Sequence, residues 1–473
     1  MKKLFSLILL ILCIATRYAL PQNLDAAGLN TPLSKTPGEI VIRGLAASGE
    51  AQLINAVVMS YNVGHFIITG LDSWAIPSSD SIYRNLTEPW EWEDTDGFKV
   101  NQMGHPIHGS VYFNAGRLNG FNFYESVFFS AFGSSSWEVF GERNTASIND
   151  FLTTVSCSMP LGEMFYRLYL EAYSGDFPMF LAICVNPMAG FHRLVTGSNP
   201  PHGGGNLYLF QTYAGTSYAQ AHSAISDSYG SKEMFSFRGP VADMGLSMIY
   251  GDPFVQESRV PFSHFEFDLS VGIDLGNYLG IRFNSDGYLF SVSPFETDMD
   301  MLTTGLSMSL DTVSAGKWDI DESSTINLFS NALAWSVKYQ HFFSQNLTLQ
   351  TRFLFGFTYL GVSEYYSPIE GRDLHNYGAG PNCKFSLNLE HKRLGKLQMS
   401  VFGYLLWTYP GTSAVQEGTA SWLFTDITYS HSIMKNWSLG IGNSFAAEHG
   451  LYGDFPDIRR YTNVTRIFLA YNK

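Results

Sequence analysis

The second half of the chain is constrained most by a two-residue alternation of apolar and polar side chains. From about residue 204 onward no apolar run is long enough for a membrane-spanning helix, yet the alternation recurs in one segment after another. Because successive side chains of a β-strand point to opposite faces, each of these segments has one apolar and one polar face. The pattern predicts long strands that separate two different environments.

Three segments show the alternation most clearly: HFEFDLSVGID, NLTLQTRFLFGFTY and GPNCKFSLNLEH. Phenylalanine, leucine, valine and isoleucine occupy one face of these segments, and ionisable or amide side chains occupy the other. The charged or ionisable residues on the polar face are His264, Glu266, Asp268, Asp274, Arg352, Lys384 and Glu390. A soluble β-sandwich would also alternate, but its polar face would lie outside and its sheets would keep free edges.

A closed membrane barrel is favoured by the aromatic residues near strand ends and by connections that alternate between short and long. The short connections are 341–346, 391–396 and 432–436, and the longer polar ones are 360–374, 409–418 and 447–459. We therefore predict a mixed fold, an N-terminal α-helical unit followed by an antiparallel transmembrane β-barrel of about 12 strands over residues 204–473. An even strand number places both chain ends on one side, and we expect a bacterial outer-membrane barrel with both termini periplasmic and membrane lipid around it.

The first residues have the pattern of a secretory signal, with two lysines followed by an apolar stretch from Leu4 to Ala15. We predict a signal peptide over 1–22, a linker over 23–44 and a helical domain over 45–200. In this last segment the apolar residues cluster in stretches long enough to form helices.

Composition excludes some classes of partner. The net charge is -14, and no run of Lys and Arg is present to bind phosphates, so a nucleic-acid partner is excluded. Charged residues make up only 15% of the chain, against roughly 25% in ordinary soluble domains. The cysteines after the leader, Cys157, Cys184 and Cys383, are too few and too scattered for a disulfide framework or a cysteine zinc site.

The stretch NQMGHPIHGSVYFNAGRLNG places two histidines around a proline. Pro106 suits the first position of a helix, which predicts His105 as the N-cap and His108 one turn in, while Asn119 and Gly120 end the helix.

Several carboxylates of the helical domain have structural interpretations. Glu125 and Asp150 follow Asn122 and Ser147 by three residues, which is the spacing of a capping box, and Glu163 precedes Arg167 by four, which favours an ion pair. Glu138 and Glu142 lie one turn apart at the end of an apolar helix. They are either a solvated helix end or a pair that binds a positive charge.

The motifs NQMGHPIHGSVYFNAGRLNGFNFYES, SSSWEVFGE, SINDF, GEMFYRL and NPMAGFHRLVTG, spread over residues 90 to 200, resemble an uncharacterised bacterial envelope family, domain of unknown function 3943. The resemblance implies a signal peptide, a helical block and a barrel-like tail, and no reaction. The polar signature of the family falls on His105, His108, Asn114, Glu125, Glu138, Glu142, Asn149, Asp150, Glu163 and Arg167.

Two hypotheses for the function follow. The first is a non-catalytic barrel whose helical domain is periplasmic or caps the lumen, and which serves transport of a small solute, gating or envelope organisation. The second is an envelope enzyme that modifies lipid or uses a metal, although no HExxH or GxSxG motif is present and no cofactor is identified. Its candidate catalytic residues are His105, His108, Glu138 and Glu163, and its candidate metal ligands are His105, His108 and Glu142.

Overall fold

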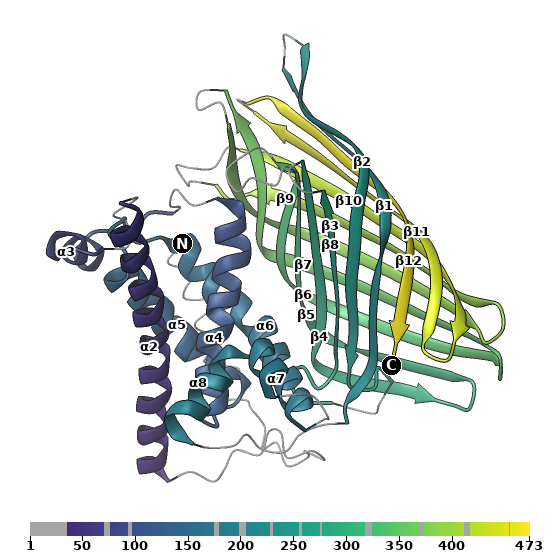
Figure 1. Cartoon of the computed structure of the whole chain (residues 1–473), viewed down its shortest axis with the longest axis horizontal. Helices are drawn as coiled ribbons and strands as arrows, with labels where there is room; N and C mark the ends of the chain where they lie inside the picture. Colours follow the sequence, from purple (N-terminus) through teal and green to yellow (C-terminus); the bar gives the residue numbers. More distant parts are fainter. Residues whose placement is uncertain are drawn as a thin grey trace. The chain divides into compact units, whose positions relative to one another are not determined.

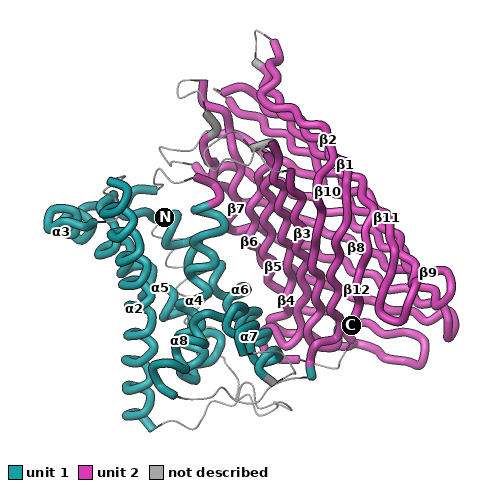
Figure 2. The backbone as a smooth tube through the Cα atoms, in the orientation of Figure 1, with its two compact units in different colours: residues 1–96, 100–205 teal, residues 97–99, 206–473 magenta. Residues whose placement is uncertain are grey.

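The computed structural model divides into two compact units, which Figure 2 shows in different colours. The first comprises residues 1–96 and 100–205, and the second comprises residues 97–99 and 206–473. The predicted signal peptide, 1–22, lies outside the described residues. The structure describes residues 36–70, 76–92, 97–174, 179–197, 205–227, 230–254, 258–274, 277–316, 324–368, 372–410, 417–453 and 455–473.

The first unit is helical, as predicted. Its main contacts join α4 to α5 and α6, while α2, α3, α7 and α8 pack around this centre. The elements are α2 (Pro37–Thr69), α3 (Ser79–Thr87), the π-helical turn η1 (Val100–Gly104), α4 (His105–Leu118), α5 (Phe123–Phe140), α6 (Ile148–Ser174), α7 (Met179–Val185) and α8 (Pro187–Thr196).

Helix α2 begins earlier than the sequence analysis predicted. Thr36 and Glu39 form a capping box, and Pro37 occupies the first turn, so the helix includes residues 37–44, which were assigned to a linker. Gly70 ends α2 in the left-handed conformation at φ 69°. The cap, rather than the first apolar clump, determines where this helix starts.

The predicted N-cap role of His105 is wrong. Helix α4 continues directly from η1, and its N-cap position, Gly104, is itself helical and makes no side-chain cap. Pro106 has no N–H to donate to the turn before it, and the π-helical turn lies where that hydrogen bond would be lost. The predicted end is confirmed, since Asn119 is the C-cap and Gly120 has φ 78°.

Helix α6 is one continuous helix with Pro160 inside it, where the sequence suggested that Pro160 would kink the helix or start a new one. It packs closely on α4 because glycine lies at the crossing. A Cβ on Gly109 would come 2.1 Å from the Thr154 carbonyl oxygen, and one on Gly162 would meet the Phe113 ring at 2.6 Å. These glycines let the polar side chains of the two helices reach each other.

The second unit is a closed barrel of 12 strands, which confirms the predicted fold (Figure 1). Every neighbouring pair is antiparallel, and β1 pairs with both β2 and β12. The strands are β1 (Leu207–Asp227), β2 (Gly230–Tyr250), β3 (Phe265–Asp274), β4 (Tyr278–Glu296), β5 (Asp300–Gly316), β6 (Ser324–Ser344), β7 (Leu347–Ser367), β8 (Arg372–His391), β9 (Gly395–Thr408), β10 (Gly418–Met434), β11 (Trp437–Tyr452) and β12 (Asp457–Asn472).

The two ends of the barrel segment meet at the same end of the barrel. Phe210 and Lys473 exchange backbone hydrogen bonds of 3.0 and 2.8 Å. The short turns 345–346, 392–394 and 435–436 lie at this end, which we call the terminal end. The strands β7, β8 and β11 extend into the predicted loops 360–374 and 447–459, so they are longer than a membrane crossing requires.

The outer face of the barrel is apolar and the inner face is polar. Phe355 is 60% exposed on the outside, whereas Lys384 beside it on β8 is buried inside. An exposed apolar surface of this extent needs lipid as its solvent, so the barrel is a transmembrane one. Its outward apolar side chains include Trp335, Phe353, Phe357, Phe385, Val401, Leu423, Ile427, Leu439, Ile441, Ile467 and Leu469.

Candidate functional site

His105 pairs with Asp150, a residue that the sequence analysis assigned to capping. The His105 Nε2 lies 3.5 Å from an Asp150 carboxylate oxygen, and the Nδ1 lies 3.3 Å from the Thr154 hydroxyl. Asp150 is fully buried, and its carboxylate also accepts a hydrogen bond from the Asn149 amide. The imidazole is therefore held in one orientation by two side chains of α6.

His108 is packed between aromatic rings. Its ring centroid lies 4.5 Å from that of Tyr112 and 5.8 Å from that of Trp137. Its Nε2 is buried and has no hydrogen-bond partner among the described residues. Burial, with a smaller contribution from His105, lowers the pKa of His108 from 6.5 to about 3. His108 is therefore neutral at physiological pH, which suits a packing residue better than a proton carrier.

Glu138 and Glu142 are buried at the end of α5, and both bind groups of the fold. The Glu138 carboxylate accepts the Ser147 backbone N–H at 2.8 Å, and the Glu142 carboxylate accepts the Trp137 indole N–H at 2.5 Å. Half of the predicted capping box is present, since the Ser147 hydroxyl accepts the Asp150 N–H at 3.3 Å, while Glu138 takes the Ser147 N–H and the Asp150 carboxylate faces His105. The box predicted at Asn122 and Glu125 is confirmed.

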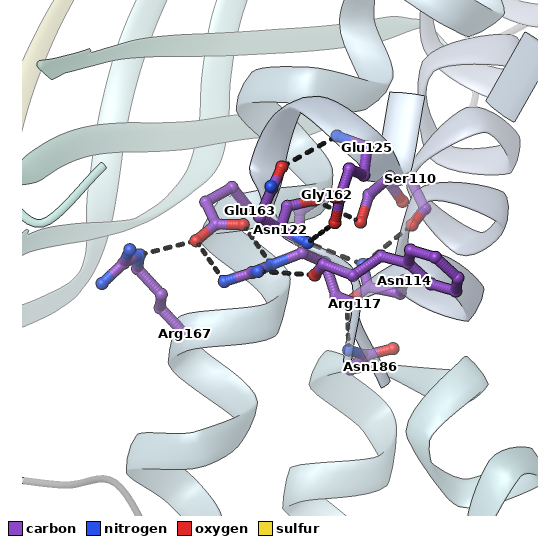
Figure 3. A network of polar contacts seen from close by, with 11 residues as sticks. Ser110, Asn114, Arg117, Asn122, Glu125, Gly162, Glu163, Arg167 and Asn186 are labelled. Atoms are coloured by element: carbon purple, nitrogen blue, oxygen red, sulfur yellow. Dashed lines mark hydrogen bonds and ion pairs between the residues drawn. The ribbon is translucent and has the colours of Figure 1, made fainter. Parts of the chain in front are cut away.

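Glu163 lies between two arginines, as Figure 3 shows. Its carboxylate oxygens lie 2.8 Å from the Arg117 Nε and 2.9 Å from the Arg167 Nε, and all three side chains are buried. The predicted pair with Arg167 is confirmed, and Arg117, which also lies over the Tyr166 ring, is an addition from α4. Nearby, Asn114 bonds the Gly162 carbonyl and accepts from Asn186.

The structure separates the candidate residues into two groups. His105, His108, Glu138 and Glu142 lie where the first turns of α4 meet the end of α5, whereas Glu163 lies near the other end of α4. Among the residues that the structure describes, no group of three or more His, Cys, Asp and Glu is arranged to hold a metal ion. Of the two candidate histidines, His105 is the one whose imidazole lies beside a carboxylate, that of Asp150.

The barrel holds a separate set of charged side chains on its inner face. Arg466 on β12 lies 3.1 Å from Asp426 and 3.5 Å from Asp243. Further pairs across neighbouring and distant strands are Lys338 with Glu266 at 3.4 Å, Arg352 with Glu266, Lys384 with Asp311 at 2.6 Å, and Arg460 with Glu364 at 3.5 Å and Glu448 at 3.7 Å. Such pairing is what makes buried charge tolerable in a barrel interior.

A cavity of about 400 Å³ lies in the lumen toward the terminal end. Its walls include Tyr208 and Phe468, close to the two ends of the barrel segment, and Glu390 and Lys396 beside a short turn. Both charge signs line it in near balance, although the whole chain has a net charge of -14. The charged lining residues are Glu266, Asp268, Glu390 and Asp426, with Arg282, Lys338, Arg352, Lys396 and Arg466.

Beyond this cavity, toward the other end of the barrel, a cluster of buried apolar side chains lies in the lumen. Strand β6 comes within 8 Å, Cα to Cα, of β1, β11 and β12, which belong to the opposite wall. The barrel is therefore narrow at this level. We call the buried side chains here the apolar layer: Val313, Ile326, Leu328, Phe402, Tyr404, Leu406, Ala420, Trp422, Phe424 and Ala446.

Sequence reasoning missed two kinds of residue. It identified the polar face of the strands but not which charges pair, because partners such as Arg466 and Asp243 are more than 200 residues apart. It also passed over Glu50, whose carboxylate lies 2.7 Å from the His192 Nδ1 and accepts the Asn119 amide at 2.9 Å. Glu50 is the only Asp, Glu, Lys or Arg between residues 45 and 69, and this isolated charge in an apolar segment could have identified it as a buried polar contact.

The solved structures that match this chain do so with low sequence identity and low TM-scores. A TodX monoaromatic hydrocarbon channel (deltaS2 mutant) is 10% identical, with 56% of this chain and 90% of that chain covered and a TM-score of 0.25. A Pseudomonas aeruginosa FadL homologue is 10% identical, with 60% and 94% covered and a TM-score of 0.23. The KdgM porin in complex with disordered oligogalacturonate is 10% identical, with 54% and 98% covered and a TM-score of 0.21.

No curated protein matches the chain. A family model does match, over residues 89–185, and its description is Domain of unknown function (DUF3943). The matched segment runs from before η1 to the end of α7 and includes every candidate site residue of the helical unit. Residues 89–185 of this chain are thus similar to the family described as Domain of unknown function (DUF3943), which confirms the resemblance seen in the sequence motifs.

Proposed function

We propose that this chain is a non-catalytic outer-membrane barrel protein that admits a small polar solute into its lumen. The observation that supports this most is the cavity of about 400 Å³, lined by charges of both signs, inside a barrel whose outer face is apolar. A cavity of this size suits a small molecule, and paired charges around it can rearrange to bind polar groups. The apolar layer, in this proposal, closes the route beyond the cavity.

The orientation in the membrane is part of the proposal. Short turns and both chain ends meet at the terminal end of the barrel, and in outer-membrane barrels such turns face the periplasm. The cavity would then open toward the periplasm, with the apolar layer on the outer side. The leader-like residues 1–22 would direct export, and the helical unit would be a periplasmic domain that organises or gates the barrel.

Trimming the apolar layer is expected to raise ion conductance through the barrel. The double substitution Phe402→Ala and Phe424→Ala removes two rings that close the lumen, so the current through single proteins in planar lipid bilayers should increase severalfold over the wild-type current. Phe355→Ala, on the lipid-facing side, is the matched control and should leave the current unchanged. Equal currents in the wild type and the double variant would contradict a transport role for the lumen.

The pairing of His105 with Asp150 favours a second candidate function for the helical unit, acid/base chemistry on an envelope lipid. A histidine oriented by a buried carboxylate can take a proton from a substrate. Incubation of the full chain with outer-membrane lipid should then produce a new lipid mass that both His105→Gln and Asp150→Asn abolish. His192→Gln, which alters a histidine paired with Glu50 instead, is the control. Unchanged lipid masses with the wild type would exclude this function.

A further inference from the structure

Helix α2 is apolar over most of its surface but is buried on one side only. Between Ala51 and Thr69 it contains no Asp, Glu, Lys or Arg. By length and composition it is one described helix that could cross a membrane, and yet its buried residues are only Ala47, Glu50, Ala51 and Asn55. A helix that is apolar all round is normally covered on every side, either by protein or by lipid.

The uncovered side of α2 has a regular outward stripe. Leu53, Val57 and Tyr61 follow one another at four-residue spacing and are 44%, 55% and 72% exposed, and Ile68 continues the same face at 84%. We call these four residues the outward stripe. Beside the stripe, Val58 is half-buried and apolar, whereas Ser60 and His65 are exposed polar residues.

Buried polar contacts of Glu50 and Asn55 fix the rotation of α2 about its own axis. The Glu50 carboxylate binds His192 of α8 and the Asn119 amide, and the Asn55 amide donates to the Gly133 carbonyl at 3.1 Å. The Tyr112 hydroxyl donates to Asn55 as well. Rotation about the helix axis would leave these buried groups without partners, which costs more than the contacts that it would gain.

The apolar surface continues on α7 and α8. Leu194 and Val195, two and three residues beyond His192, are 83% and 58% exposed, and Phe180 on α7 is 71% exposed. The unit is thus apolar on these surfaces, while its interior contains the buried side chains of Glu138, Asp150, Glu163 and both arginines. Exposed apolar surface of this kind marks a site of contact with a membrane or with another protein.

The covalent chain keeps these surfaces near a bilayer. Ten residues, 197–206, connect α8 to β1, and a fully extended chain of that length spans at most about 35 Å. Strand β1 belongs to the transmembrane barrel. A membrane is therefore within reach of the helical unit in every molecule, whereas a protein partner must be recruited.

We propose that the outward stripe of α2 and the exposed ends of α7 and α8 contact the acyl chains of the bilayer that holds the barrel. Lipid is favoured over a protein partner because residues 51–69 contain no Asp, Glu, Lys or Arg and because the helical unit is covalently joined to a transmembrane barrel. The proposal rests on the transmembrane barrel and does not depend on the solute that the lumen admits. The helical unit is then a membrane-bound domain whose polar interior is shielded from lipid.

Quenching of a fluorescent label on the full-length protein tests this contact. Cys184→Ser and Cys383→Ser remove the accessible thiols of the described residues, since Cys157 is buried, and Cys13→Ser removes the thiol of the leader. Val57→Cys is then labelled with bimane and the protein is reconstituted into phosphatidylethanolamine and phosphatidylglycerol vesicles, with or without brominated-acyl phosphatidylcholine. Phe355→Cys on the barrel surface is the lipid-facing control, and Asp80→Cys on exposed α3 is the aqueous control.

Contact with lipid predicts that brominated lipid lowers the fluorescence at residue 57 by the same factor as at residue 355, while iodide in the buffer quenches only residue 80. Quenching at residue 57 by iodide to the extent seen at residue 80 would overturn the proposal. Quenching by neither agent would also overturn it, because the stripe would then be covered by protein, such as a second copy of the chain. The control at residue 355 reports separately whether the barrel itself is in the membrane.

Discussion

Replacing Glu163 with glutamine is expected to destabilise the helical unit by about 3–5 kcal/mol, the usual cost of leaving a buried charge without its partner. Both Arg117 and Arg167 are bound through Nε to the Glu163 carboxylate and are almost fully buried. Glutamine keeps the size of the side chain and supplies one neutral acceptor, so two guanidinium groups would lose their counter-charge. Hydrogen exchange of the α4 and α6 amides in the full-length protein measures the loss.

The matched control for Glu163→Gln is Glu125→Gln. Glu125 is an exposed member of the capping box with Asn122, so its substitution should cost about 1 kcal/mol or less. Equal protection of the amides in the two variants would show that the arginines find other partners or that water reaches them. Changing all three charged residues to methionine should recover much of the stability, because no buried charge would remain.

Acid is expected to destabilise the helical unit through His108. The pKa of His108 is about 3 in the folded protein, against 6.5 for an ordinary histidine, so below pH 6.5 the unfolded chain binds a proton that the folded chain does not. Stability is unaffected above pH 6.5 and falls by about 1.4 kcal/mol per pH unit below it, or about 3 kcal/mol near pH 4.5. The groups that face this ring are His105, Tyr112 and Trp137, with Glu142 bound to the far side of the indole.

The substitution His108→Phe isolates this effect. Phenylalanine can pack on Tyr112 and Trp137 but cannot take up a proton, so the acid-dependent loss between about pH 6.5 and pH 4.5 should be smaller in the variant by the amount that His108 contributes. Hydrogen exchange of α4 and α5 at the two pH values, for the wild type and the variant, gives the difference. Identical pH dependence in both proteins would mean that His108 is protonated in the folded state as well.

The barrel could be predicted from the sequence because its signal is local. Each strand repeats the same alternation, and Phe353, Phe355 and Phe357 face lipid for the same reason that their neighbours face the lumen. The ends of the helices could be predicted where neighbouring residues form the cap, as at Asn122 and Glu125 or at Gly70. They were not predictable at His105, where the chain continues through a π-helical turn.

The candidate site was predicted only as a set of residues. The sequence did not predict which of these residues lie together, because it does not specify how the helices cross. Gly109 and Gly162 bring α4 within contact of α6, which places Asp150 beside His105 and Arg117 beside Glu163. A one-residue shift of either helix would rotate these side chains by about 100° and pair them differently.

The sequence by itself determined the fold class, the even number of strands and the chemical character of each barrel face. These depend on the two-residue alternation of side chains along each strand and on the short and long connections between strands. The tertiary structure decided which charges pair in the lumen, where the apolar layer narrows it, and that α2 exposes its apolar stripe while its few polar side chains are buried. The physical reason is the range of the interactions. Helix caps and the alternation of side chains along a strand are encoded locally, whereas the ion pairs and ring contacts join side chains more than 200 residues apart, such as Arg466 and Asp243.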